Sequence, residues 1–265
     1  MVWLGAASGS ARNAVTCSPP AEAKQILKLQ SRYLIFGELH GTAESPTAFG
    51  ELVCAAVAVG EPVVVALEFP LSSSKAFEKY LLSSGNETDV ENFLRSTHWA
   101  SPTQDGRTSV AMFELFERLR RLRAAGLTFH IAGFVRQPTG SLSQEAHERG
   151  MAEQLQEFAK LYPKSRLFVL VGNLHARKHK IGTGGESSAS MAALLPPAEV
   201  ATVRFLDDGG TAWVCLMNPD GAPSCGEHAV GPAGRSRAFL GFDYTIFVGR
   251  VSASPPMWSN RKQKR

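Results

Sequence analysis

Two stretches decide the fold of this chain: YLIFGELH, residues 33–40, and LFVLVGNLH, residues 167–175. Each is an apolar run that predicts a strand buried on both faces, and each ends in the pattern Gly-x-x-His. Groups just past the carboxyl ends of parallel strands line the ligand crevice of an open α/β sheet. If the two strands are neighbours, His40 and His175 therefore meet in one cleft.

Apolar runs alternate with amphipathic stretches along most of the chain, as is typical of an α/β fold. The second histidine strand is predicted to span 166–171, and further strands are predicted at 63–67, 127–132, 200–205, 211–217 and 244–251. Helices are predicted at 47–59, 72–84, 109–125 and from 141 or 143 to 162. Residues 85–108 read as a long irregular loop, and the turn signal DDGG at 207–210 predicts a hairpin. We expect a layered α/β domain with a mostly parallel central sheet flanked by helices and with partly antiparallel C-terminal strands.

The length and composition suit one large domain. The chain has 265 residues and is 44% hydrophobic, which is ample for a single core spanning residues 31–252. Residues 1–30 read as a targeting remnant or linker that runs into a short helix near 22–29. Residues 253–265 are expected to form a basic disordered tail, because 260–265 carry four cations and no anion.

Charge and hydropathy bear on the partners and the location. The net charge is +4, but no basic stripe is interleaved with aromatic residues, so we expect no nucleic-acid partner. No apolar run approaches the ~20 residues of a transmembrane helix. The first 14 residues contain a small apolar stretch and a site resembling a signal-peptide cleavage site, which favours a periplasmic or secreted protein. They lack a basic start, so a cytoplasmic location is the alternative, and the oligomeric state stays unknown.

The four cysteines allow two disulfides. Cys215 and Cys225 flank a turn-rich segment and could close a loop, and Cys17 and Cys54 would then form the other pair. An even number of cysteines suits an oxidising compartment. Free thiols are the alternative, since Cys54 lies in an apolar predicted helix where a buried thiol is common.

An acidic or amide residue accompanies each histidine at the strand ends. Glu38 and His40 are two residues apart, Asn173 and His175 repeat this spacing, and Glu68 ends the strand predicted at 63–67. Glu38, His40, Glu68 and His175 are therefore the candidate catalytic residues, with hydrogen-bonded caps of the strand ends as the alternative. His40, His175 and Glu68 are ligand types that suit a divalent metal ion such as zinc, manganese or cobalt. The same residues suit metal-free hydrolysis, in which a histidine or glutamate activates water.

Other residues have weaker claims. His147 lies on the inward stripe of the predicted helix before 162 and is a candidate third imidazole for a cofactor, or else a histidine at the edge of the core. Asn173 is a candidate to orient the substrate. His98 and Trp99 are candidates for a lid within the predicted loop, His130 is expected to be structural, and the glycine-rich 182–185 is expected to be a flexible loop.

Four segments resemble the TIKI/ChaN-like superfamily: FGELHGTAE at 36–44, LEFP at 67–70, ERGMA at 148–152 and VGNLHA at 171–176. That superfamily contains the TIKI metalloproteases, the TraB/PrgY/GumN proteins, the ChaN-type haem-binding lipoproteins and the erythromycin-esterase-like hydrolases. The resemblance implies an α/β fold whose cleft is built from both Gly-x-x-His strings and acidic residues. It assigns His40, His175, Glu38 and Glu68 to that site.

The activity that the resemblance implies differs between branches. TIKI-like members imply metal-dependent peptide hydrolysis, and the esterase-like branch implies that a histidine and glutamates activate water for ester cleavage. We therefore expect a hydrolase that cleaves a peptide or ester bond of a peptide or small-molecule substrate, with or without a metal ion. The alternative is a ChaN-type haem- or iron-binding protein without catalysis. This chain spaces its first pair as Glu-x-His where the esterase branch has Glu-x-x-His, and no tyrosine is clearly placed as a haem ligand.

Overall fold

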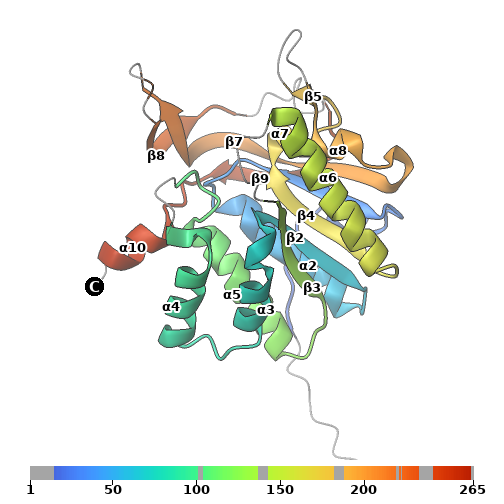
Figure 1. Cartoon of the computed structure of the whole chain (residues 1–265), viewed down its shortest axis with the longest axis horizontal. Helices are drawn as coiled ribbons and strands as arrows, with labels where there is room; N and C mark the ends of the chain where they lie inside the picture. Colours follow the sequence, from blue (N-terminus) through green and yellow to red (C-terminus); the bar gives the residue numbers. More distant parts are fainter. Residues whose placement is uncertain are drawn as a thin grey trace, which may run out of the picture.

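Seven strands form the central sheet in a computed structural model of the chain. The structure describes residues 15–100, 104–136, 143–181, 188–218, 221, 223–232 and 241–263. They are β1 (Tyr33–Glu38), β2 (Val63–Pro70), β3 (His130–Val135), β4 (Arg166–Gly172), β7 (Val200–Met217), β8 (Pro223–Val230) and β9 (Tyr244–Val251). Their order is β3-β2-β4-β1-β7-β8, and β9 also pairs with β7 (Figure 1). Every pairing is parallel except that of β7 with β8. The predicted fold class is therefore confirmed.

Helices cover both faces of this sheet (Figure 1). The α-helices are α1 (Ala23–Leu27), α2 (Glu44–Ala58), α3 (Ser74–Leu81), α4 (Glu87–Ser96), α5 (Val110–Ala124), α6 (Gln144–Leu161), α7 (Asn173–Ala176), α8 (Met191–Leu194) and α10 (Met257–Gln263). Short 3-10 turns are η1 (Leu71–Ser73), η2 (His98–Ala100) and η4 (Pro197–Glu199), and β5 (Lys180–Ile181) pairs with β6 (Ser188–Ala189). None of the helices in the described ranges combines the length and the hydropathy that a bilayer crossing requires.

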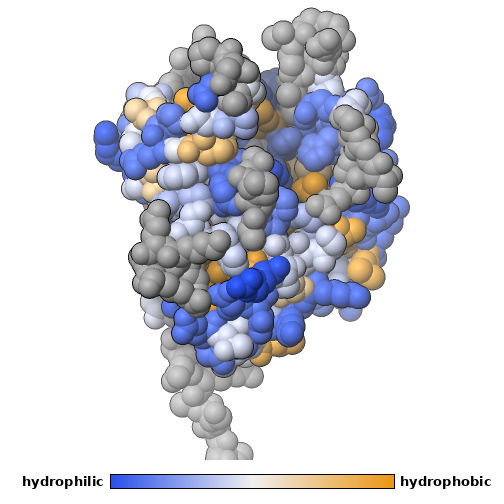
Figure 2. All heavy atoms as spheres, turned by 60° about the vertical axis from the view of Figure 1, so that its left-hand side comes forward, coloured by the Kyte–Doolittle hydropathy of each residue, from blue (hydrophilic) through white to orange (hydrophobic). Residues whose placement is uncertain are grey.

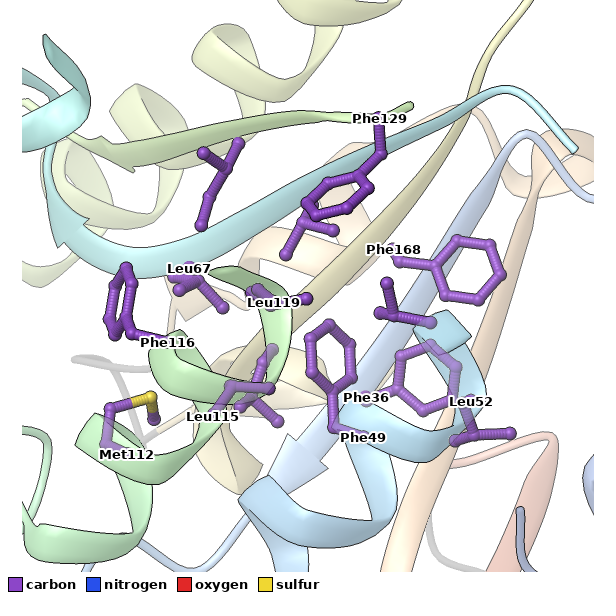
Figure 3. Packing of buried hydrophobic residues seen from close by; sticks show 14 of the residues in the cluster. Phe36, Phe49, Leu52, Leu67, Met112, Leu115, Phe116, Leu119, Phe129 and Phe168 are labelled. Carbon is purple, nitrogen blue, oxygen red and sulfur yellow. The ribbon is translucent and has the colours of Figure 1, made fainter. Parts of the chain in front are cut away.

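Alternation of side chains along β1 divides the core into two clusters. Leu34 and Phe36 lie in a cluster with α2, α3 and α5, whereas Tyr33 and Ile35 lie in a cluster with α6 and α8. Figure 3 shows part of the first cluster, where Phe49 packs beside Phe36 with their ring centroids 5.3 Å apart. Because β1 is buried on both faces, the residues at its carboxyl end are held on a rigid strand.

Large hydrophobic side chains on the surface are scattered. The most exposed are Val59, Leu82, Met217 and Leu161, each at or next to the end of a different element. On the face in Figure 2 the hydrophobic residues likewise lie singly or in small groups among hydrophilic ones. Such isolated apolar side chains are normal on a folded surface and identify no binding face.

The prediction of a loop at 85–108 is wrong in its first part, because Glu87–Ser96 form α4. The Asn86 side chain accepts a hydrogen bond from the amide of Asp89, and the Asp89 carboxylate accepts one from the amide of Asn86. This capping box starts the helix. Val90, Phe93 and Leu94 then recur at helical spacing and are buried, so a helical pattern was present in the sequence.

Trp99 does not form a lid. Its side chain is fully buried, and its ring centroid lies 5.8 Å from that of Phe69 and 5.9 Å from that of Phe93. His98, by contrast, is exposed. The indole belongs to the aromatic core because burying so large an apolar surface contributes more than leaving it on a mobile segment.

The predicted hairpin at 207–210 is also wrong, because both flanking runs belong to the single strand β7. Gly209 and Gly210 have φ angles of +77° and +138°, and the register of β7 against β9 shifts between Asp207 and Gly210. These glycines therefore make an irregularity within a strand instead of a turn. The second half of β7 pairs with β8, a strand that the sequence pattern did not predict.

The C-terminal segment corrects the prediction of a disordered tail. Ala253 pairs with Thr42, Ser254 is buried with its Oγ accepting a hydrogen bond from the amide of Ala111, and α10 follows. These contacts satisfy backbone groups that a free tail would leave to solvent. At the other end α1 lies within the predicted short helix, whereas the targeting segment at 1–14 and the loop at 182–185 lie outside the described residues.

Two disulfides are present, and they are the two pairs that the sequence suggested. Cys17–Cys54 ties the segment before α1 to α2, and Cys215–Cys225 joins directly opposed residues of β7 and β8. The first pair is separated by 37 residues in sequence and the second by 10. Each cross-link therefore restricts the unfolded chain to a different degree.

Removing the disulfide that closes the longer loop, Cys17–Cys54, should lower the free energy of unfolding more than removing Cys215–Cys225. Chain-entropy arguments give a loss of about 4 kcal/mol in the free energy of unfolding for Cys17→Ser with Cys54→Ser, and about 3 kcal/mol for Cys215→Ser with Cys225→Ser. Denaturant unfolding of the two double variants under identical conditions measures both losses. A larger loss from the Cys215–Cys225 pair would contradict this ranking.

Candidate functional site

The carboxyl ends of β1, β2 and β4 bring four predicted side chains together. Glu38 ends β1 and His40 follows it, Glu68 lies near the end of β2, and His175 lies in α7 directly after β4. Because β1 and β2 both pair with β4 in parallel, these ends meet at one edge of the sheet. The two Gly-x-x-His strings therefore do converge, as their pattern predicts.

Glu38 and His40 form a carboxylate–imidazole pair. His40 Nδ1 lies 2.8 Å from Glu38 Oε1, and His40 Nε2 lies 3.4 Å from Glu68 Oε2. The Glu38 side chain is only 3% exposed, whereas that of His40 is 22% exposed. Glu38 therefore orients the ring so that Nε2 faces Glu68 at the edge of the site.

A second pair of the same kind contains Glu148, a residue of α6 that the sequence pattern did not assign to the site. His175 Nδ1 lies 2.6 Å from Glu148 Oε1, while Glu148 Oε2 accepts a hydrogen bond from the amide of Met191 at 2.7 Å. Gln144 Nε2 also donates to this carboxylate, whose side chain is fully buried. A signal was available, because Glu148 lies three residues before Met151 on the inward stripe of the helix.

Glu68 lies between the two pairs. Its Oε2 accepts a hydrogen bond from the amide of Gly172 at 2.7 Å and faces His40, and its Oε1 lies 4.0 Å from His175 Nε2. Arg107 Nη1 donates to Oε1 at 3.2 Å. A carboxylate that is 7% exposed needs such partners, because an uncompensated buried charge is costly.

The charges in the site favour protonated imidazoles beside an ionised carboxylate. Burial disfavours the charged form of His40, but Glu68 and Glu38 outweigh it and raise the pKa of His40 to about 10. Burial also opposes ionisation of Glu68, yet His40, His175 and Arg107 lower the pKa of its carboxyl group. For His175, burial is outweighed by Glu148 and Glu68, which raise its pKa. At neutral pH Glu68 is therefore ionised and His40 carries a proton on each ring nitrogen.

His147 lies beside this cluster, with its ring centroid 5.7 Å from that of His175. Burial, together with the charge of His175, lowers the pKa of His147, so this imidazole is neutral at neutral pH. It is thus the third imidazole that its place on the helix predicted. Its role at a cofactor stays a prediction.

Asn173 does not repeat the geometry of Glu38. β4 ends at Gly172 and residues 173–176 form a helical turn, so Asn173 and His175 do not share one face of a strand. The Oδ1 atom of Asn173 is buried without a hydrogen-bond partner in the described part of the chain, and a Cβ at Gly37 would lie 2.8 Å from it. Gly37 therefore permits the close approach of α7, and a role for Asn173 in substrate binding stays a prediction.

Arg107 and Asp105 belong to the same cluster and were missed, because they lie in the stretch that reads as a loop. Arg107 Nη2 lies 2.5 Å from Asp105 Oδ2, and Arg107 Nε lies 3.0 Å from the same oxygen. Burial opposes ionisation of Asp105, but its pairing with Arg107 lowers the pKa. No periodicity points to a residue whose partner, Glu68, is 39 positions away.

The side chains of the site are arranged around one another and not around a metal ion. His40 Nδ1 is taken by Glu38, His175 Nδ1 is taken by Glu148, and Glu68 is occupied by Gly172 and Arg107. Within the described ranges no group of three or more His, Cys, Asp or Glu side chains is disposed to hold a metal ion. This arrangement does not fit the predicted metal centre, so no chemical step is derived through one, and metal and haem binding stay untested predictions.

Comparisons with known proteins bear on the fold. No protein-family model and no curated protein matches the sequence. A mutant of erythromycin esterase EreC in its open conformation matches in structure with a TM-score of 0.59 and 13% identity, over 79% of this chain and 78% of that chain. A succinoglycan biosynthesis protein matches with a TM-score of 0.60 and 10% identity, over 90% and 87%. A Bacillus cereus protein matches with a TM-score of 0.54 and 10% identity, over 89% and 92%.

At these identities the likeness shows the fold alone. The chain has the fold of an erythromycin esterase, and this agrees at the level of the fold with the resemblance to the TIKI/ChaN-like superfamily. The geometry of the site has to carry any statement about chemistry, because one fold hosts many activities.

Adding a methyl group at Gly172 should displace His40. A Cβ there would lie 2.8 Å from His40 Nε2 and 3.5 Å from Glu68 Oε2, so Gly172→Ala should push the ring away from Glu68. We expect the pKa of His40 to fall from about 10 towards 6.5, because Glu68 raises it. NMR titration of the imidazole signals measures this shift.

Gly150→Ala is the matched control. A Cβ at Gly150, in α6, would meet no atom within 4 Å, so this variant should leave the pKa of His40 unchanged. It should raise the free energy of unfolding by about 0.5–1 kcal/mol, because glycine is unfavourable inside a helix. A His40 pKa that stays near 10 in Gly172→Ala would show that this close approach does not set the position of the ring.

Proposed function

We propose that this protein is a hydrolase that cleaves an ester bond with an activated water, using two carboxylate–histidine pairs of opposite role. The observation that carries the proposal is the convergence of the Glu38–His40 pair and the Glu148–His175 pair on the single carboxylate of Glu68. Pairs of this kind serve as acids and bases, because the carboxylate fixes the ring and stabilises its protonated form.

His175 is proposed as the general base. Its Nδ1 is held by Glu148, which leaves Nε2 as the atom that can accept a proton from water. The 4.0 Å between His175 Nε2 and Glu68 Oε1 is too long for a direct hydrogen bond. It suits one water molecule that donates one proton to each atom, which would direct the water oxygen towards the substrate.

His40 is proposed as the general acid. Its pKa of about 10 keeps it protonated at neutral pH, so it can donate a proton but not accept one. Its side chain is 22% exposed, the most accessible of the two imidazoles and Glu68, which suits a group that must reach a leaving group.

The proposed hydrolysis has an addition step and an elimination step. The water oxygen forms a bond to the ester carbonyl carbon while His175 Nε2 takes one of the water protons. The bond from that carbon to the alcohol oxygen then breaks while His40 Nε2 gives its proton to the departing oxygen. The products are an acid and an alcohol, and the proton on His175 returns to His40 through solvent.

An ester is favoured over a peptide because a solved structure with this fold is an erythromycin esterase. The substrate is proposed to be a small molecule, with a peptide as the alternative. The two disulfides support the proposal of a periplasmic or secreted location, because such bonds persist in oxidising compartments.

Replacing either histidine should abolish most activity. We expect His40→Ala and His175→Ala each to lower kcat on an alkyl ester by about 10²–10⁴-fold, because each removes one proton-transfer step. On p-nitrophenyl acetate, whose leaving group departs without a proton, His40→Ala should lose much less than His175→Ala. Release of acid and of p-nitrophenol measures the two rates.

The matched control is His98→Ala, which removes an exposed imidazole outside the site and should leave both rates unchanged. Equal losses in His40→Ala on the two esters would contradict the assignment of His40 as the acid. Full activity in both site variants would contradict the proposal as a whole.

The pH dependence of kcat/KM should be bell-shaped. The rate should rise with pH through the pKa of His175, which is raised above 6.5, because the base must lose its proton. It should fall again near pH 10, because the acid must keep its proton. Glu148→Gln should move the lower limb to lower pH, since Glu148 raises the pKa of His175, and Glu38→Gln should move the upper limb to lower pH. A profile that is flat from pH 6 to 11 would contradict both roles.

A further inference from the structure

We propose that Arg107 binds the oxyanion that forms when water adds to the ester carbonyl. This role rests on the proposed function. Neither the sequence pattern nor the comparisons assign this residue a role. The guanidinium of Arg107 has hydrogen-bond donors that its partners within the site do not use.

Arg107 uses only part of its donors inside the site. A guanidinium has five N–H groups, and in Arg107 the Nε group and one group of Nη2 point to Asp105 while one group of Nη1 points to Glu68. One N–H on each terminal nitrogen therefore remains, and no other protein acceptor for them lies within the described residues. The side chain is 33% exposed against 7% for Glu68, so Arg107 is more accessible than the carboxylate with which it pairs.

Backbone contacts hold the segment that carries Arg107 against the segment that carries His40. Gly106 has a φ of +95°, and a Cβ there would lie 2.5 Å from the amide nitrogen of Gly41 and 2.9 Å from the carbonyl carbon of His40. Gln104 O accepts a hydrogen bond from Trp213 Nε1 at 3.1 Å. Thr108 O accepts one from the amide of Met257 at 3.0 Å. Contacts on both sides of Arg107 therefore fix its position relative to His40.

The charges around Glu68 suggest that Arg107 does more than pair with this carboxylate. Glu68 already has the amide of Gly172 and the imidazolium of His40, and Asp105 offsets the charge of Arg107 before the reaction starts. When the carbonyl oxygen becomes negative, the remaining N–H groups of Arg107 are available to donate to it. Donors that are oriented in advance towards the developing charge are usually the largest contribution to catalysis of this kind.

The experiment compares an oxygen ester with its thiono ester, in which sulfur replaces the carbonyl oxygen. Sulfur is a poor hydrogen-bond acceptor, so wild-type protein should hydrolyse p-nitrophenyl acetate much faster than p-nitrophenyl thionoacetate. We expect Arg107→Met to lower kcat on the oxygen ester by about 10²–10³-fold with little change in KM. The same change should affect the thiono ester far less, so the ratio of the two rates should fall towards one.

Two further variants keep the result interpretable. Arg107→Lys keeps the positive charge but loses the planar set of N–H donors. It should fold normally and recover only part of the ratio of oxygen-ester to thiono-ester rates. Arg149→Met removes an exposed arginine of α6 that pairs with Glu145, and it should leave both rates unchanged. Added guanidinium chloride at millimolar concentration should partly restore the oxygen-ester rate of Arg107→Met.

The outcomes separate this inference from the function on which it rests. Arg107→Met with an unchanged ratio of oxygen-ester to thiono-ester rates would overturn the inference, even if both rates fell, because Arg107 would then only position Glu68. Esterase activity that depends on His40 and His175 but not on Arg107 would overturn it while leaving the proposed function intact. Wild-type protein without any activity on either ester would overturn both.

Discussion

The buried carboxylate of Glu68 is the group on which the arrangement of the site depends. It lies at the centre of the strand-end cluster, where it contacts the amide of Gly172, faces His40 and His175, and pairs with Arg107. These groups compensate the charge of the ionised carboxylate, which would be costly to bury alone. The same charge, together with Glu38, raises the pKa of His40 to about 10, and together with Glu148 it raises the pKa of His175.

The fold supplies the rigidity that such a cluster needs. β1, β4 and β2 are adjacent, parallel and buried on both faces, so the three chain segments that leave their carboxyl ends start from fixed positions. The two glycines that end the strand runs then allow close packing, with α7 lying over Gly37 and His40 lying against Gly172. A side chain at either position would separate groups that must touch, which explains why glycine stands at both.

The sequence pattern predicted the residues on strands better than their partners on helices and loops. Glu38, His40, Glu68 and His175 follow apolar runs, and a parallel sheet brings the ends of such runs to one edge. Glu148 lies on the inward stripe of an amphipathic helix, but only its hydrogen bond to His175 in the folded chain connects it with the strand ends. Arg107 lies in a segment without periodicity, so only its contacts across the fold connect it with Glu68.

The errors in the fold have related physical causes. The sequence pattern predicts an irregular stretch after Gly85 although Asn86 and Asp89 carry a capping signal, and it makes Trp99 a candidate for a lid although an indole gains most from burial. At Gly209 and Gly210 the local signal for a turn was overridden, because β8 and β9 both pair with β7 and extend it as one strand. The local preference of a sequence for a turn is therefore overridden where pairing with distant strands stabilises an extended conformation.

The sequence by itself determined the class of fold, the two strand ends that carry histidines, and the pairs of cysteines that could join. These follow from composition and from periodicity, which depend on neighbours along the chain. Only the tertiary structure decided that Glu148 and Arg107 complete the site and that His40 holds its proton at neutral pH. Those properties depend on distances between residues far apart in sequence and on burial, and neither exists until the sheet and its helices have packed.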